Sequence, residues 1–194
     1  MRHNRPLSAK HQQAFTLIEL LVTITMLGVI MAIALPNLRD FVVGNRLSSN
    51  VNAFVGMLNY ARSEAIVRNK RVIVCAKQDG AIGCQNTTEW GRFETQVFVR
   101  EDPTSNSNSR IGSDILLKIF PAIDVSDTQF RFIRREGANV ISFQSGGLGT
   151  NTYRFDINAV DADSAYETKF GRTICISRPG RARVVALTSN PCGA

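Results

Sequence analysis

Histidine, the side chain most often used for acid–base chemistry, occurs at two positions only, His3 and His11. Both lie in a polar N-terminal segment, residues 1–14, which has three basic residues and no acidic one. A short basic segment ahead of a long apolar stretch is typical of a targeting signal and not of a folded domain. Without it, no histidine is left for a catalytic triad or a zinc site, and the formal charge falls from +7 to +4.

Neighbouring carboxylates are the next candidates for acid–base catalysis. Glu101 stands beside Asp102, and Asp161 is close to Asp163, but both pairs lie in polar, loop-like sequence where solvated surface is the default interpretation. The glycine-rich stretch 146–149 would cradle a phosphate only if a helix followed it, and no helical pattern follows. We therefore expect no enzymatic activity, no cofactor and no metal.

The end of the chain is strongly basic. No acidic residue follows Glu167, so the positive charges there are uncompensated. A turn at Pro179 and Gly180 would place Arg181 and Arg183 side by side, because alternate residues of a strand share a face. Guanidinium groups spaced in this way bind phosphates with salt-sensitive affinity that does not depend on base sequence. A solvated turn is the other interpretation. The further basic residues that would contribute are Lys169, Arg172 and Arg178, with Arg131, Arg134 and Arg135 if they lie nearby.

An apolar stretch from Phe15 to Leu35 lies between the two histidines and the carboxylates and arginines considered above. It is interrupted by three threonines, Gly28 and Glu19 only. With a rise of about 1.5 Å per residue, a helix of this length just crosses the ~30 Å hydrocarbon core of a bilayer. A carboxylate at the centre of such a helix costs roughly 2.5–3.5 kcal/mol, so we expect a positive partner for Glu19. Snorkelling of this carboxylate to the headgroups is the alternative.

The rest of the chain predicts one α+β head. Pro36 predicts a kink or an unwound turn. Beyond it, apolar residues recur at helical spacing to about Asn69, so residues 36–69 should form an amphipathic helix. We expect this long N-terminal helix to pack on an antiparallel β-sheet head, residues 70–194, with residues 102–113 as a mobile loop. Short β-type runs predict strands over 72–76, 95–99, 115–120, 129–133, 140–143, 152–157, 173–177 and 182–186.

The start of the apolar stretch resembles a known processing site. The string Ala14-Phe-Thr-Leu-Ile-Glu19 resembles the cleavage and methylation motif of type IV prepilins and type II secretion pseudopilins. This resemblance implies that a prepilin peptidase removes the leader, residues 1–14, between Ala14 and Phe15, and that the new amino group of Phe15 is N-methylated. It also implies that Glu19 pairs with the amino terminus of a mature Phe15 during assembly. The family usually has glycine where this chain has Ala14.

The helix and the head are similar to the GspH/FimT branch of that family. The similarity implies a minor pilin or pseudopilin that helps to initiate or cap a type IV pilus or a type II secretion pseudopilus, together with other pilins. It implies a single-pass protein of the bacterial inner membrane, spanning it with residues 15–35, with its head in the periplasm and with incorporation into a pilus at the cell surface. The similar stretches are Leu58–Ile66, Cys75–Cys84, Trp90–Gly91, Val97–Phe98, Ile141–Phe143, Gly146–Gly147 and Ile176–Arg183.

An alternative function comes from the basic turn. The sequence Gly180-Arg181-Ala182-Arg183, with Arg178 beside it, resembles the Gly-Arg-x-Arg motif of FimT-type minor pilins, which bind DNA in natural transformation. This resemblance implies double-stranded DNA as a partner. Similar Gly-Arg turns occur in branch members that serve secretion, so the motif alone does not decide between the two functions.

The cysteines are candidates for disulfides. All four lie beyond the apolar stretch, and export of the head would place them in an oxidising compartment. Proximity along the chain favours Cys75 with Cys84, and Cys175 with Cys192. The sequence itself leaves the connectivity open.

Overall fold

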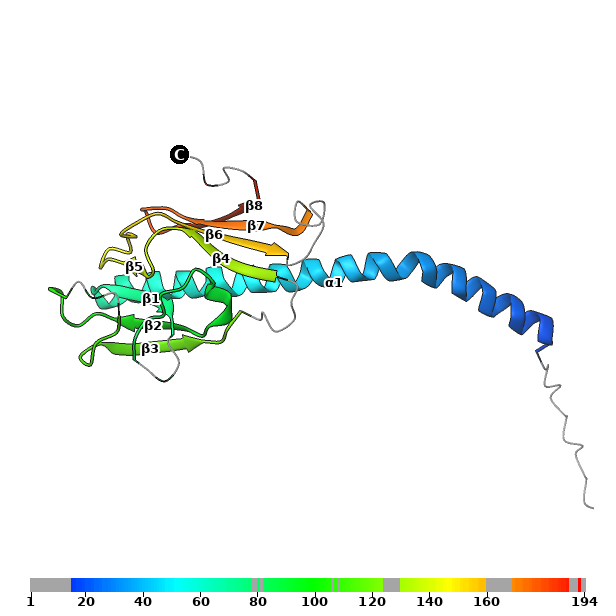
Figure 1. Cartoon of the computed structure of the whole chain (residues 1–194), viewed down its shortest axis with the longest axis horizontal. Coiled ribbons are helices and arrows are strands. Elements are labelled where there is room, and N and C mark those ends of the chain that lie inside the picture. Colours follow the sequence, from blue (N-terminus) through cyan, green and yellow to red (C-terminus); the bar gives the residue numbers. More distant parts are fainter. Residues whose placement is uncertain are drawn as a thin grey trace, which may run out of the picture. The chain divides into compact units, whose positions relative to one another are not determined.

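The computed structural model describes residues 15–77, 80, 82–105, 107, 109–123, 130–159, 169–188 and 192. The chain forms two compact units, Met1–Val43 and Gly44–Ala194. A single helix, α1 (Leu17–Arg68), runs through both units (Figure 1). The leader with Ala14, and the pair Asp161 and Asp163, lie outside the described residues.

Helix α1 is continuous through Pro36, so the unwound turn expected there does not occur. Proline removes one backbone hydrogen bond, and the bonds of the flanking turns keep the helix intact. In the second unit the helical spacing buries one face as predicted, although Ile66 stays half exposed. The buried positions of this face are Leu47, Val51, Phe54, Leu58, Ala61 and Ala65.

The eight predicted strands are present and divide into two four-stranded sheets. The first sheet has the order β3-β2-β1-β5, with β1 at Val72–Ala76, β2 at Thr95–Val99, β3 at Ile115–Phe120 and β5 at Ile141–Phe143. The second has the order β4-β6-β7-β8, with β4 at Phe130–Glu136, β6 at Tyr153–Ala159, β7 at Arg172–Ile176 and β8 at Ala182–Ala186. All pairings are antiparallel, so the predicted α+β class is confirmed.

Aromatic side chains join α1 to both sheets. The ring of Phe54 lies 4.5 Å from that of Phe132 on β4 and 5.1 Å from that of Phe155 on β6, measured between centroids. Trp90, from the short 3-10 helix η1 (Trp90–Arg92), closes this cluster at 5.2 Å from Phe155. One turn and a half further along α1, Tyr60 meets Phe120 of β3 at 6.0 Å. The helix is therefore the element that the two sheets share.

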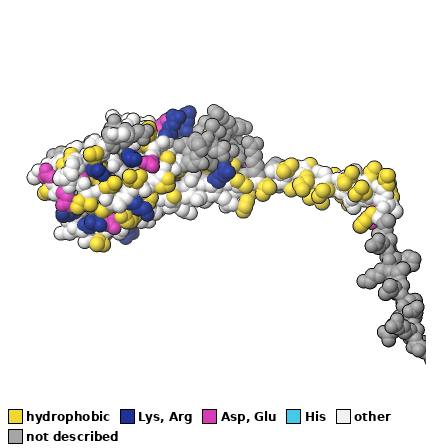
Figure 2. All heavy atoms as spheres, turned by 90° about the horizontal axis from the view of Figure 1, so that it is seen from below, with side chains coloured by type: hydrophobic (Ala, Val, Ile, Leu, Met, Phe, Trp, Pro, Cys, Tyr) yellow, Lys and Arg dark blue, Asp and Glu magenta, His cyan; other side chains and the backbone are white. Residues whose placement is uncertain are grey.

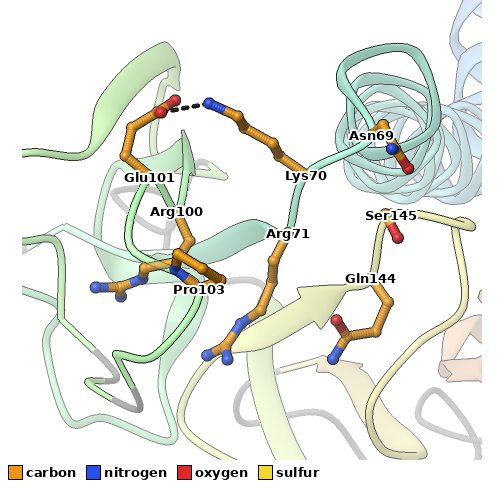
Figure 3. A pocket seen from close by; sticks show the side chains of 8 residues that line it. All are labelled: Asn69, Lys70, Arg71, Arg100, Glu101, Pro103, Gln144 and Ser145. Atoms are coloured by element: carbon orange, nitrogen blue, oxygen red, sulfur yellow. Dashed lines mark hydrogen bonds and ion pairs between the residues drawn. The ribbon is translucent and has the colours of Figure 1, made fainter.

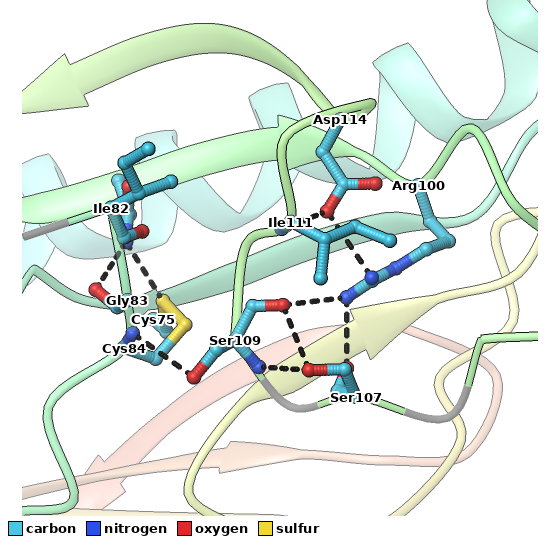
Figure 4. Close-up of a disulfide and its surroundings, with 10 residues drawn as sticks. Cys75, Ile82, Gly83, Cys84, Arg100, Ser107, Ser109, Ile111 and Asp114 are labelled. Atoms are coloured by element: carbon cyan, nitrogen blue, oxygen red, sulfur yellow. Dashed lines mark hydrogen bonds and ion pairs between the residues drawn. A yellow bond between two sulfur atoms is a disulfide. The ribbon is translucent and has the colours of Figure 1, made fainter.

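Strands β1 and β2 are buried on both faces, which explains the continuous apolar sequence of β1, whereas β2 begins with the buried polar residues Thr95 and Gln96. A small second core forms around Ile73, Cys75 and Phe98, with Cys84 packed against it. The loop that carries Cys84 is held in place by the Cys75–Cys84 disulfide (Figure 4). The Gln96 side-chain amide also donates to the Gly83 carbonyl of this loop at 2.9 Å. Loops thus cover part of the first sheet.

The described residues of the loop 102–113 are organised around a buried arginine. The Arg100 guanidinium donates to the carbonyls of Ser107 at 2.8 Å and Ser109 at 3.0 Å, and it pairs with Asp114 at 3.2 Å (Figure 4). Asp114 in turn accepts from the backbone N–H of Ile111 at 2.8 Å. The prediction of a loop between two strands is confirmed for these residues, and its mobility stays a prediction. A charged residue at the end of β2 bonds the loop backbone instead of solvent.

Candidate assembly helix and arginine turn

The N-terminal part of α1 presents an uncovered apolar surface. Among the described residues, α1 is the one helix whose length and composition would allow it to cross a membrane. Phe15 is 81% exposed and Leu17 is 82% exposed, and apolar side chains follow along the helix (Figure 2). Soluble monomers rarely expose a contiguous apolar surface of this size, so the segment requires lipid or other helices around it.

A threonine cap fixes where α1 begins. The backbone N–H of Glu19 donates to the Thr16 hydroxyl oxygen at 3.3 Å, and the first helical residue is Leu17. The spacing Thr16-x-x-Glu19 is that of a capping box, in which an acidic residue also lies near the positive end of the helix dipole. This signal was readable in the sequence and was not among our expectations. The helix therefore starts two residues after Phe15.

Glu19 is the polar side chain of this segment that lacks a partner. The hydroxyls of Thr23 and Thr25 donate to the carbonyls of Leu20 at 2.8 Å and Val22 at 2.9 Å, so the helix itself satisfies them. The Glu19 carboxylate is exposed, and within the described chain it has no hydrogen bond or ion pair. In an apolar environment the positive charge that stabilises it must come from another molecule or from the chain terminus.

The arginine turn lies between β7 and β8. The side chains of Arg178, Arg181 and Arg183 are exposed, as the sequence suggested. Arg183 is not free, because its guanidinium donates to the Cys192 carbonyl at 3.2 Å. Gly180 is buried and takes a positive φ of 74°. The backbone conformation of the turn therefore favours glycine at position 180, whether or not a ligand binds there.

The other arginines do not join this turn. Arg131, Arg134 and Arg135 lie on β4, which is the opposite edge of the sheet from β8, with β6 and β7 between them. At about 4.8 Å between strands, this is a separation of roughly 14 Å. Arg134 donates to the Asn139 side chain at 2.7 Å, burial lowers its pKa, and Arg135 pairs with Asp156 at 3.2 Å. The structure does not gather these residues into one phosphate-binding surface.

Arg62 of α1 holds the loop between β5 and β6, a role that the sequence did not reveal. Its Nε donates to the Gly147 carbonyl at 3.0 Å. An ideal Cβ built on Gly180 would lie 2.2 Å from the same carbonyl oxygen. The Gly149 N–H donates to the Arg178 carbonyl at 2.8 Å. Helix, loop and arginine turn thus form one junction.

Both cysteine pairs suggested by proximity are joined in the structure. Cys75 and Cys84 are linked, as are Cys175 of β7 and Cys192 near the end of the chain. The second link also brings the Cys192 carbonyl to Arg183. Each bridge therefore ties a loop or a tail to a strand.

The candidate catalytic carboxylates have structural partners. The Asp102 carboxylate accepts from the Thr104 hydroxyl at 2.6 Å and from the Thr104 backbone N–H at 2.8 Å, and these bonds hold its pKa below the usual range. Glu101 pairs with Lys70. Over the described part of the chain, no group of three His, Cys, Asp or Glu residues could hold a metal ion.

Known proteins resemble this chain in sequence and in fold. It matches the family model of type II transport protein GspH over residues 50–180 and that of the prokaryotic N-terminal methylation motif over residues 9–35. It is 33% identical over 109 residues to a fimbrial protein of Pseudomonas aeruginosa, spanning 53% of this chain and 70% of that protein. The crystal structure of the type IV minor pilin FimU of Pseudomonas aeruginosa has a similar fold, with a TM-score of 0.51, 20% identity and coverage of 75% of this chain and 91% of FimU.

Proposed function

Because the chain belongs to the GspH family of minor pilins and pseudopilins, we propose that it helps to initiate or cap a type IV pilus or a type II secretion pseudopilus. Members of this family are structural subunits and not enzymes, and we extend this to the present chain. The observation that carries the proposal is the apolar segment of α1, which is exposed and carries one carboxylate without a partner in the described chain, that of Glu19.

Processing would create the partner that Glu19 lacks. Cleavage between Ala14 and Phe15 by a prepilin peptidase would leave a methylated ammonium group on Phe15, directly before the Thr16 cap. In a bilayer or a helical bundle, the Glu19 carboxylate of one subunit is stabilised by such an amino terminus, its own or that of another pilin. If an incoming subunit were displaced along the bundle axis, its amino terminus would not reach the Glu19 carboxylate, and the ammonium group and the carboxylate would both stay unpaired. Pairing would therefore fix the axial position of each added subunit.

The proposed location is supported by the exposed apolar segment of α1. Residues 15–35 would span the inner membrane once, residues 36–69 would continue into the head, and the remainder would lie in the periplasm. The two disulfides fit this compartment, because the periplasm is oxidising. On incorporation into a pilus, the head would reach the cell surface.

The chain's own amino terminus tests the proposal. We would purify the protein from membranes and from sheared filaments of a producing strain and determine the N-terminal mass. The expected result is a chain that starts with N-methylated Phe15 in both fractions. A chain that still starts at Met1, or one that is processed in membranes and missing from every filament and pseudopilus preparation, would count against it.

DNA capture is the second candidate function, and its support is the exposure of Arg178 and Arg181 on the arginine turn. The test is a titration of the full-length protein in detergent with double-stranded DNA at several salt concentrations, beside the double variant Arg181→Gln, Arg183→Gln. Affinity that falls with salt and is lost in the variant would establish this function. Equal binding by the variant, or no binding at low salt, would reject it.

A further inference from the structure

A pocket of about 440 Å³ lies where the carboxyl end of α1, the end of β2 and the end of β5 meet (Figure 3). Its rim includes exposed Asn69, Lys70, Gln144 and Ser145, so it opens to solvent. Its volume is in the range of pockets that hold small organic groups. The remaining lining residues are Arg71, Arg100, Glu101 and Pro103.

Unlike Arg100, which lines the same pocket and pairs with Asp114 although its own Nε is unsatisfied, Arg71 has no ion pair among the described residues. Its Nε is buried without a hydrogen-bond partner, and its guanidinium has no hydrogen bond or ion pair within the described part of the chain. Figure 3 shows its side chain between Pro103 and Gln144. Burial lowers the pKa of Arg71 and the nearby charge of Arg100 lowers it further, while Tyr153 and the Asp114 carboxylate raise it in part. A half-buried cation without a partner costs free energy, so an anion that enters here is favoured.

The other charges of the pocket are already paired. The Lys70 ammonium pairs with the Glu101 carboxylate, and Arg100 pairs with Asp114 at 3.2 Å with both side chains fully buried. Arg71 therefore supplies a single uncompensated positive charge. A monoanion balances it, whereas a phosphate dianion would leave excess negative charge beside Glu101 and near the carbonyls that end α1. A carboxylate also matches the planar fork of a guanidinium.

We propose that this pocket is a receptor for a carboxylate, in which Arg71 binds an aspartate or glutamate side chain of a neighbouring filament subunit. The choice of a subunit as the source rests on the proposed function, whereas the chemistry of the pocket does not. The proposed function places other subunits around the head, and their acidic side chains would supply the carboxylate.

The first experiment measures the pocket alone, in full-length protein in detergent. Thermal unfolding is followed in propionate and in its neutral isostere propionamide, at matched ionic strength. At ten times the dissociation constant, propionate should raise the midpoint by roughly 3–6 °C in the wild type, while propionamide has no effect. The Arg71→Gln variant should lose this shift, and without propionate it should melt at the same or a higher temperature. Arg92→Gln, which removes an exposed arginine elsewhere, should keep the shift.

Two results of that experiment would overturn the proposal. One is a wild type without a saturable propionate shift. The other is an Arg71→Gln variant that melts lower than the wild type, which would make Arg71 a structural residue. Should Arg71→Gln fail to fold, Arg71→Lys takes its place. Lysine keeps the positive charge but lacks the planar guanidinium, so propionate should raise the unfolding midpoint of this variant less than that of the wild type. An unchanged shift in that variant would contradict recognition by the guanidinium.

The second experiment identifies the source of the carboxylate. A photo-crosslinking amino acid at Ser145, at the rim, should join this chain to another pilin in cells, and Arg71→Gln should abolish the product. A propionate shift without any crosslink would mean that the pocket binds a free carboxylate and not a side chain of another subunit. A crosslink that persists in Arg71→Gln would reject the proposed contact. A Glu19→Ala control distinguishes a failure of assembly from a failure of the pocket. This variant should lose the crosslink because it does not assemble, and it should keep the propionate shift.

Discussion

The Nε of Arg62 on α1 donates to the carbonyl oxygen of Gly147 at 3.0 Å, across 85 residues of chain. That carbonyl belongs to the loop that leads from the first sheet to the second, and it faces Gly180 of the arginine turn. A turn that looked like a ligand-binding motif in the sequence is thus also a structural joint. Changes at this joint should act on the fold before they act on any partner.

Gly180→Ala should destabilise the head. Gly180 has a φ of 74°, and an ideal Cβ would lie 2.2 Å from the Gly147 carbonyl oxygen. Left-handed strain and a backbone clash together should lower the free energy of unfolding by roughly 2–4 kcal/mol, measured by urea denaturation. Gly146→Ala is the matched control, because its Cβ would meet nothing within 4 Å. Equal stability of the two variants would mean that the joint is absent in solution.

Arg100→Met should be among the most damaging single changes in the head. Arg100 and Asp114 pair with fully buried side chains, and removing one partner leaves a buried charge uncompensated. We expect a loss of about 3–5 kcal/mol in the free energy of unfolding and faster proteolysis within residues 102–113. The control is Arg68→Met, which breaks the exposed pair with Glu64 and should change the free energy of unfolding little. A loss of similar size in both variants would show that the Arg100 pair is not buried as described.

Stability should depend on pH through Asp102. Hydrogen bonds from Thr104 hold the pKa of this carboxyl below its usual range in the folded protein. A depressed folded-state pKa means that the stabilisation is complete above the ordinary value of about 4 and is lost as the pH falls through the lower folded-state value. The stability difference between the wild type and Asp102→Ala should therefore be constant near neutral pH and shrink below about pH 4.

Asp102→Asn provides the control for this titration. Its amide oxygen can still accept from Thr104 but does not ionise in this range, so its difference from Asp102→Ala should not change with pH. A wild-type difference that stays constant down to pH 2 would mean that the turn around Asp102 does not form.

Local residue types predicted most elements of the fold. The run Val72–Ala76 and the spacing from Leu47 to Ala65 gave a strand and a helix at the positions where the structure has them. The division into two sheets did not follow, because strand order depends on contacts between distant residues. For the same reason, the sequence could not show that Arg131 and Arg183 belong to opposite edges of one sheet.

The candidate site was predictable where its chemistry is local. Glu19 stood out because a lone carboxylate in an apolar helix is costly, and the Thr16 cap could have been read from the same six residues. The roles of Arg62 and Arg100 could not be predicted from the sequence, since their positions are also those of ordinary solvated arginines. Only the partners supplied by the fold, the Gly147 carbonyl and Asp114, distinguish them.

The most direct test of the account is the amount of Glu19→Gln protein in sheared filaments relative to the membrane pool. This variant keeps the size of the side chain and removes its charge. We predict normal processing, a folded head and a filament fraction reduced about tenfold or more, a change of ~1.4 kcal/mol or more. Thr23→Val, which removes a hydroxyl that the helix itself satisfies, should enter filaments normally. Wild-type incorporation of Glu19→Gln would contradict the claim that this carboxylate directs assembly.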